Sequence, residues 1–200
     1  MNELKKYNAT AFVSCSLRPE DDPFIRMVEK ILDIHGIKFF GTVGRHSASP
    51  VNPAELMRTN IPLADMVVII ATPRYVQTDI QTGKVNLGLS EMVHAESGMA
   101  YMLNKPVIVF VQEGTNVGNF LPNVTQYIVL KDYMDANNKS KIIASLLLNA
   151  HKIVEQMRDN QSKKQFNDFG MTALAAVGGA FLFSELFLVD EPNKTRKKKK

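Results

Sequence analysis

One apolar run constrains the fold of this chain more than any other feature: Met66-Val-Val-Ile-Ile-Ala-Thr72. The run has the length of a strand and is apolar at every position up to its final threonine. It therefore lacks the polar alternation of a strand with one face in water. A strand that is buried on both faces is typical of the centre of a parallel sheet covered by helices, so the run predicts an α/β domain.

The segments on either side of this run alternate between strand and helix patterns. Strands are predicted at 11–15, 37–40 and 106–112, and a weaker edge strand at 126–130. Helices are predicted at 22–34, 53–60 and 87–104, and long loops at 41–53 and 73–86. This order predicts an open parallel sheet with flanking helices, and such sheets bind ligands at the carboxyl ends of their strands.

The distribution of charge argues against nucleic-acid binding. The net charge is +4, but residues 190–200 hold six Lys and Arg against two acidic residues. The remaining 18 basic and 18 acidic residues cancel, so no broad basic face is expected on the body of the protein. The single cysteine, Cys15, excludes an internal disulfide framework and a cysteine-cluster zinc site. The four scattered histidines show no metal-ligand spacing, and we expect no metal.

The last third of the chain is predicted to extend beyond the α/β domain, which we place at residues 8–133. Residues 136–166 are predicted to form a connecting helix, followed by the run 169–189, in which Glu185 is the one ionisable group. This run has the length of a membrane-spanning helix, and the basic tail 190–200 favours anionic lipid. We therefore expect a membrane protein with its α/β domain in the cytoplasm, since the N-terminus does not resemble a signal peptide. The positive-inside rule also favours a cytoplasmic tail, so a re-entrant segment stays an alternative to a spanning one.

The predicted helix 87–104 places a carboxylate among apolar side chains. Its predicted buried stripe consists of Leu89, Met92, Val93, Glu96, Met99, Ala100 and Leu103. A carboxylate in this position is costly unless it has a partner or a function. The helix follows the central strand, so Glu96 is expected near the carboxyl ends of the strands and is the candidate catalytic residue. The alternative, a glutamate that only caps nearby backbone, stays open.

The residues around Glu96 resemble the TIR (Toll/interleukin-1 receptor) domains that cleave NAD. Ser90-Glu-Met-Val-His-Ala-Glu-Ser-Gly-Met-Ala100 and Asn104-Lys-Pro-Val-Ile-Val are similar to the third helix and fourth strand of these domains. Glu96 takes the catalytic position and Met92 that of an aromatic residue. Three further segments resemble other TIR motifs: Ala11-Phe-Val-Ser14, Gly36-Ile-Lys-Phe-Phe40 and Ala64 to Tyr75. The resemblance covers about residues 8–133 and implies a flavodoxin-like open parallel sheet.

This resemblance implies an NAD+ glycohydrolase or cyclase that cleaves the nicotinamide–ribose bond. NAD+ or a related nucleotide is then the substrate, and no separate cofactor is needed. Glu96 is expected to be catalytic, with substrate contacts from Ser14, Ser16, Arg18, Phe40, Thr72, Tyr75 and Met92. The family also implies self-association, here through the TIR-like domain and the membrane helix, and a role in bacterial defence or cell-death signalling.

Part of the same signature supports a different enzyme. Glu96-Ser-Gly-Met-Ala100 with Lys105-Pro-Val also resembles nucleoside 2-deoxyribosyltransferases, in which a glutamate attacks C1′ of the sugar. Both families break an N-glycosidic bond through a transition state of oxocarbenium character, which one carboxylate can stabilise. Two interpretations without catalysis also stay open: a TIR signalling adaptor, and a ligand sensor whose membrane segment is the effector.

Overall fold

The computed structural model describes residues 7–40, 52–118, 121, 125 and 127–185. The chain divides into two compact units, Met1–Glu155 and Gln156–Lys200. The first unit holds both β-sheets and the two apolar cores. The limits predicted for the α/β domain and the terminal segments stay predictions.

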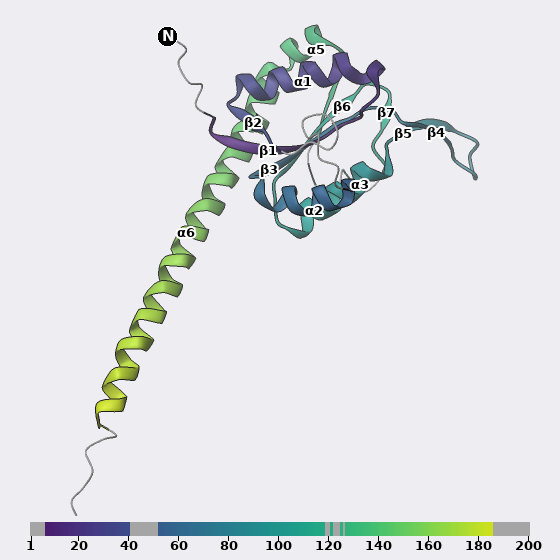
Figure 1. Ribbon diagram of the computed structural model, residues 1–200. Helices are drawn as coiled ribbons and strands as arrows, with labels where there is room; N and C mark the ends of the chain where they lie inside the picture. Colours follow the sequence, from purple (N-terminus) through teal and green to yellow (C-terminus); the bar gives the residue numbers. More distant parts are fainter. Residues whose placement is uncertain (1–6, 41–51, 119–120, 122–124, 126, 186–200) are drawn as a thin grey trace, which may run out of the picture. The chain divides into compact units, whose positions relative to one another are not determined.

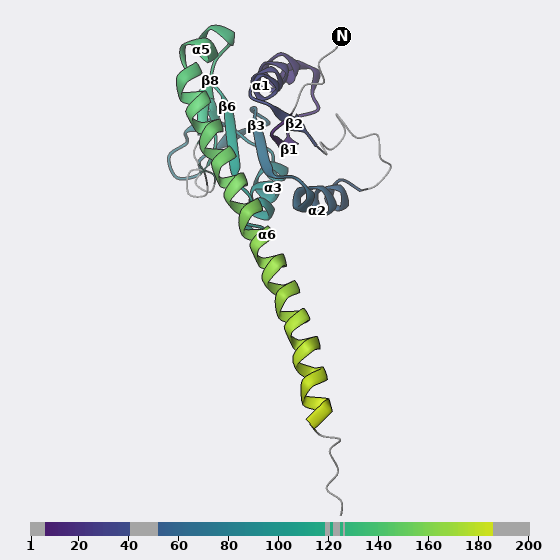
Figure 2. The same ribbon diagram turned by 90° about the vertical axis from the view of Figure 1, so that its left-hand side faces the viewer.

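Five parallel strands form the main sheet (Figures 1 and 2). In spatial order they are β2 (Ile37–Phe39), β1 (Ala9–Ser14), β3 (Met66–Ala71), β6 (Val107–Gln112) and β8 (Tyr127–Leu130). Numbered along the chain within this sheet, the order is 2-1-3-4-5, which is the flavodoxin-like order. The predicted fold class, an open parallel sheet of flavodoxin type, is confirmed. The apolar run that predicted a central strand is β3, and every residue of β3 is buried.

The two faces of the sheet carry separate cores. Alternate residues of β3 belong to different clusters: Met66, Val68 and Ile70 to one, Val67, Ile69 and Ala71 to the other. The first cluster includes α1 (Asp22–Ile34) and the first turns of α6 (Ser140–Glu185). The second includes α2 (Pro53–Leu63) and α3 (Glu91–Met102). The side-chain period of two in a strand thus produces a three-layer α/β/α arrangement (Figure 2).

Helix α1 has the boundaries predicted for it, and a 3-10 turn, η1 (Pro19–Asp21), precedes it with Asp21 in the N-cap position. The boundaries of the other helices differ from the predicted ones for local reasons. Helix α3 begins at Glu91, because the Ser90 side chain caps it by accepting a hydrogen bond from the Met92 amide at 3.3 Å. After α3 the chain turns at Asn104, whose φ of 53° is the left-handed conformation in which helices commonly end.

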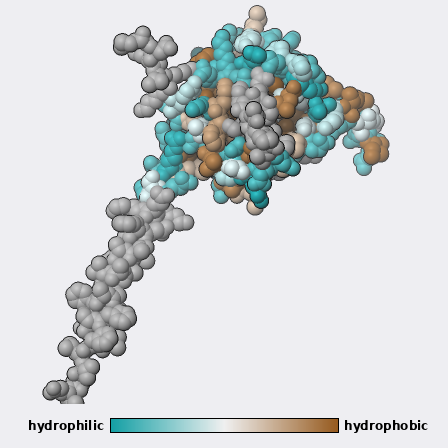
Figure 3. Space-filling model, viewed as in Figure 1, coloured by the Kyte–Doolittle hydropathy of each residue, from teal (hydrophilic) through white to brown (hydrophobic). Residues whose placement is uncertain are grey.

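The loop predicted at 73–86 contains a β-hairpin. Strand β4 (Tyr75–Thr78) pairs antiparallel with β5 (Val85–Gly88), and the short β7 (Thr115–Asn116) pairs parallel with β5. The hairpin extends away from the main sheet in Figure 1. Exposed apolar side chains gather on it, visible as brown atoms in Figure 3, and the tip residue Ile80 is 99% exposed. Because these strands bury little apolar surface, their sequence lacks the signal that identifies β3.

The C-terminal third is helical but differs from the prediction. A short helix, α5 (Tyr133–Asn138), precedes α6, which continues to Glu185, so the helix predicted at 136–166 is interrupted near Lys139 and does not end at 166. Among the described residues, no helix combines the length and the apolar character that a membrane crossing requires. Residues 186–200, which include the end of the predicted membrane segment and the basic tail, lie outside the described residues, and membrane association stays a prediction.

The central position of β3 leads to a stability prediction. Ile69 is completely buried, so Ile69→Ala is expected to lower the free energy of unfolding by about 2–5 kcal/mol through lost burial and the cavity left behind. The matched control is Ile80→Ala at the exposed hairpin tip, with an expected change within about 0.5 kcal/mol. Urea denaturation of both variants measures the difference, and equal losses at the two positions contradict the placement of β3.

Candidate active site

A cavity of about 820 Å³ opens at the carboxyl ends of β1 and β3. The chain leaves β1 toward β2 on one side and leaves β3 toward β6 on the other, so this is the point where a flavodoxin-like sheet forms its ligand crevice. The cavity walls come from four segments: the end of β1 and the turn after it, the start of α2, the end of β3 with the start of the hairpin, and the first turns of α3.

Glu96 is the buried carboxyl of this cavity. It lies on α3 with its side chain between the positions of Val93 and Ala100, which belong to the core cluster under α2 and α3. Only 5% of Glu96 is exposed. Burial raises the pKa of Glu96 from 4.5 to about 7, because the charged form loses its hydration. At neutral pH both the protonated and the ionised form are therefore present.

Ser14 meets Glu96 from the opposite wall. It is the last residue of β1 and lies two positions after Phe12, so its side chain is on the sheet face that α3 covers. The Ser14 hydroxyl is hydrogen-bonded to the Glu96 carboxyl, and this bond lowers the pKa of Glu96, opposite to the effect of burial. The buried pair brings the first strand and the third helix together at the cavity.

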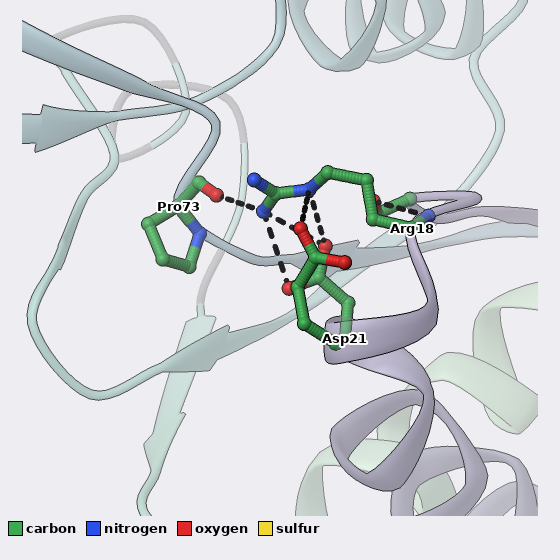
Figure 4. Close-up of polar contacts among 5 residues, drawn as sticks. Arg18, Asp21 and Pro73 are labelled. Atoms are coloured by element: carbon green, nitrogen blue, oxygen red, sulfur yellow. Dashed lines mark hydrogen bonds and ion pairs between the residues drawn. The ribbon is translucent and has the colours of Figure 1, made fainter.

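Arg18 connects two of the cavity walls (Figure 4). Its Nε donates to Asp21 Oδ2 at 3.0 Å, and its Nη2 donates to the same oxygen at 2.9 Å. Asp21 is almost completely buried, and Nη2 also donates to the carbonyl oxygen of Pro73. The turn after β1 is thus tied to the segment after β3. The predicted contact between Arg18 and the substrate stays a prediction, and the guanidinium already has these protein partners.

The start of the hairpin supplies a polar part of the wall. The Tyr75 hydroxyl donates to Glu91 Oε2 at 3.0 Å, and the guanidinium of Arg74 lies 5.9 Å from the centre of the Tyr75 ring. All three residues line the cavity. Arg74 and Glu91 are not among the residues that the sequence predicted for the site. Their positions were the available signal, because Arg74 lies three residues after the end of β3 and Glu91 begins the helix that carries Glu96.

The structure brings seven of the eight predicted site residues to one cavity: Ser14, Ser16, Arg18, Thr72, Tyr75, Met92 and Glu96. Phe40 does not line it. The Phe40 ring packs, partly buried, against the core cluster under α2 and α3, because Phe40 follows β2 at the sheet edge, where its amide donates to the Ala11 carbonyl.

The buried face of α3 also differs from the predicted stripe. Met92, predicted to be buried, is 42% exposed, while Ser97, which is not part of the predicted stripe, is fully buried with its hydroxyl donating to the Val93 carbonyl. Leu103, at the end of the stripe, is exposed as well. In the described part of the chain, no three His, Cys, Asp or Glu side chains gather closely enough to hold a metal ion.

The similarity of this chain to known proteins is limited to the fold of solved structures at low sequence identity. No protein-family model and no curated protein matches the chain. Three solved structures show partial similarity. A CMP N-glycosidase from Clostridium botulinum has 16% identity and a TM-score of 0.42, covering 66% of this chain and 98% of that chain. A 2-deoxyribosyltransferase from Bacillus psychrosaccharolyticus has 17% identity and a TM-score of 0.41, covering 65% and 91%. A conserved protein from Enterococcus faecalis has 12% identity and a TM-score of 0.40, covering 76% and 98%. The resemblance to TIR domains finds no support in these comparisons.

The raised pKa of Glu96 predicts how stability depends on pH. Because the folded-state pKa of about 7 lies above the unfolded value of 4.5, ionisation destabilises the folded chain as pH rises through this range. At pH 8 Glu96→Gln is therefore expected to be more stable than wild type by about 3 kcal/mol, a difference that disappears near pH 4.5. Urea denaturation at both pH values measures it.

The control for this prediction is Glu155→Gln, which changes an exposed glutamate on α6. It is expected to alter the free energy of unfolding by no more than about 0.5 kcal/mol at either pH. A Glu96→Gln variant that is less stable than wild type at pH 8 contradicts the assigned environment of Glu96.

Proposed function

We propose that this chain is an N-glycosidase that acts on a nucleoside or nucleotide, with Glu96 as its catalytic carboxylate. The observation that carries the proposal is the buried Glu96 carboxyl, which lines the cavity at the ends of β1 and β3 with its pKa raised to about 7. A carboxyl whose pKa is strongly perturbed by burial in a cleft is typical of a functional site.

Glu96 in its ionised form faces the anomeric carbon of the sugar in the proposed reaction. As the bond from C1′ to the base nitrogen breaks, its electron pair leaves with the base and positive charge develops on the sugar. The carboxylate stabilises this charge or bonds to C1′. Water then adds its hydroxyl to C1′, and Glu96 is regenerated as a carboxylate. The proton of the water goes to the departed base when the base leaves as an anion, and to the solvent when the base leaves neutral. Burial strengthens the attraction, because little water screens the carboxylate.

The neighbouring side chains fit supporting roles. The Ser14 hydroxyl orients the Glu96 carboxyl and favours its ionised form. Tyr75 and Met92 are partly exposed and line the same cavity, so they offer apolar surface to a planar base. The cavity volume of about 820 Å³ lies within the range of small-molecule sites.

Within this class, NAD+ is a narrower candidate substrate. Its nicotinamide carries a positive charge on the ring and departs as a neutral base, so no protein acid needs to protonate it. The other carboxyl among the lining residues, Glu91, accepts a hydrogen bond from Tyr75. This arrangement favours a leaving group that does not need a general acid. Self-association and a role in bacterial defence, implied by the resemblance to TIR domains, stay predictions.

The direct test is base release by the purified full chain. Wild type, Glu96→Gln and the surface control Glu155→Gln are incubated with ribonucleosides, deoxyribonucleosides, their 5′-monophosphates and NAD+, and the products are separated chromatographically. We expect wild type and Glu155→Gln to release base from at least one of them, and Glu96→Gln to be slower by about 10²- to 10⁴-fold. Folded wild-type protein that cleaves none of them supports the adaptor or sensor interpretation instead.

The protonation state of Glu96 predicts the pH profile of this reaction. Because the ionised form reacts, kcat/KM is expected to rise with pH through a midpoint of about 7 and then to level off. Ser14→Ala removes the hydrogen bond that lowers the pKa of Glu96, so the midpoint of its profile is expected at higher pH. Profiles between pH 5 and 9 measure both. A rate that falls above pH 7 assigns Glu96 the role of a general acid, and an unchanged midpoint in Ser14→Ala contradicts the role of Ser14.

A further inference from the structure

Among the described residues, two arginines line the cavity, and their surroundings differ. Arg18 forms an ion pair with the buried Asp21 at 2.9 Å and donates to the Pro73 carbonyl (Figure 4). Arg74 is exposed, and its guanidinium lies over the ring of Tyr75. Among the described residues, no carboxylate forms an ion pair with Arg74. The charge of Arg18 is therefore compensated within the protein, whereas that of Arg74 is available to an anion.

The backbone holds Arg74 in position at the cavity wall. The Arg74 amide donates to the Gly88 carbonyl at 2.7 Å, and the preceding residue, Pro73, is fixed by Arg18. The following residue, Tyr75, pairs with Gly88 in the hairpin. A guanidinium that lies over an aromatic ring can keep its N–H donors directed outward, where they can form two parallel hydrogen bonds to a phosphate. The fixed backbone and the contact with the Tyr75 ring thus favour a bidentate contact at Arg74.

The other charges around the cavity are compatible with an anion near Arg74. The first turn of α3 lines the same cavity, and the positive end of its helix dipole attracts negative charge. Glu91 is the opposing charge in that turn, and its carboxylate accepts a hydrogen bond from the Tyr75 hydroxyl. Glu96, with its pKa near 7, is only partly ionised at neutral pH.

We propose that Arg74 binds a phosphate group of the substrate, so that the substrate class is a 5′-phosphorylated N-ribosyl compound and not a free nucleoside. This inference rests on the proposed function and makes it more specific. Arg74 and Glu96 line one cavity, so a single ligand can place its sugar at Glu96 and its phosphate at Arg74. Arg18 then acts as a positioning residue that fixes the segment before Arg74.

Binding to a variant that does not turn over tests the phosphate contact separately from catalysis. The full-length Glu96→Gln chain is titrated calorimetrically with ribonucleosides, their 5′-monophosphates and NAD+. At least one phosphorylated ligand is expected to bind roughly 10- to 100-fold more tightly than the corresponding nucleoside. Monophosphates and NAD+ form separate arms, which distinguish a simple nucleotide from a dinucleotide.

Adding Arg74→Ala to this variant is expected to remove the preference, and Arg74→Lys to restore part of it, because lysine keeps the charge but not the bidentate geometry. The matched control is Arg58→Ala on α2, an exposed arginine that pairs with Glu55 and does not line the cavity. Equal affinity for nucleosides and their phosphates, no binding of any phosphorylated ligand, or tight phosphate binding that survives Arg74→Ala overturns the proposal.

The two proposals fail in different ways. If phosphorylated ligands bind through Arg74 but wild type cleaves none of them, the phosphate contact stands and the N-glycosidase proposal falls. If wild type cleaves nucleosides and nucleotides equally well, with no effect of Arg74→Ala on either, the N-glycosidase proposal stands and the phosphate contact falls.

Discussion

The parallel pairing of β1 and β3 is the constraint on which both the core and the cavity depend. The register places Ser14 beside Ile69, so the two strands end at one edge of the sheet, and the chain leaves them in opposite directions. Alternate β3 side chains require a helical layer on each face. Packing of α3 through Val93 and Ala100 then fixes the position of Glu96, because residues 93, 96 and 100 share one face of a helix. The core thus determines where the carboxyl meets the crevice.

The buried position of Glu96 lowers the stability of the fold but supports the function proposed for this residue. An ionised carboxylate in an apolar layer destabilises the fold, but the same loss of hydration strengthens its interaction with a developing positive charge. The hydrogen bond from Ser14 offsets part of the destabilisation and favours the ionised form. The pair thereby keeps the pKa of Glu96 near 7, where both protonation states are accessible, and does not leave the carboxyl permanently neutral. Sites that carry such a conflict are commonly functional.

The sequence predicted the parts of the molecule whose residue pattern lies within a single segment of the chain. The apolar run of β3 identified the centre of the sheet, and Glu96 stood out because it interrupts an apolar stripe. The hairpin could not be predicted, since β4 and β5 are short, exposed strands stabilised by pairing and not by burial. Met92 is exposed and Ser97 is buried, contrary to the predicted stripe. Apolar residues lie on several sides of α3, so tertiary packing decides which side of the helix faces the core. The Arg18–Asp21 pair likewise depends on how the turn before α1 folds.

The division of roles between the two arginines follows from where their partners lie. Arg18 has Asp21 three positions along the chain, close enough for a turn to bring them together, so its charge is compensated locally. Arg74 has an aromatic neighbour instead, which orients the guanidinium without neutralising it. An anionic substrate group near Glu96 disfavours ionisation of that carboxyl, because like charges raise a pKa. A cation at the phosphate end of the same cavity reduces this repulsion, so Arg74 supports both the binding of a phosphorylated ligand and the ionised state of Glu96 that the proposed chemistry requires.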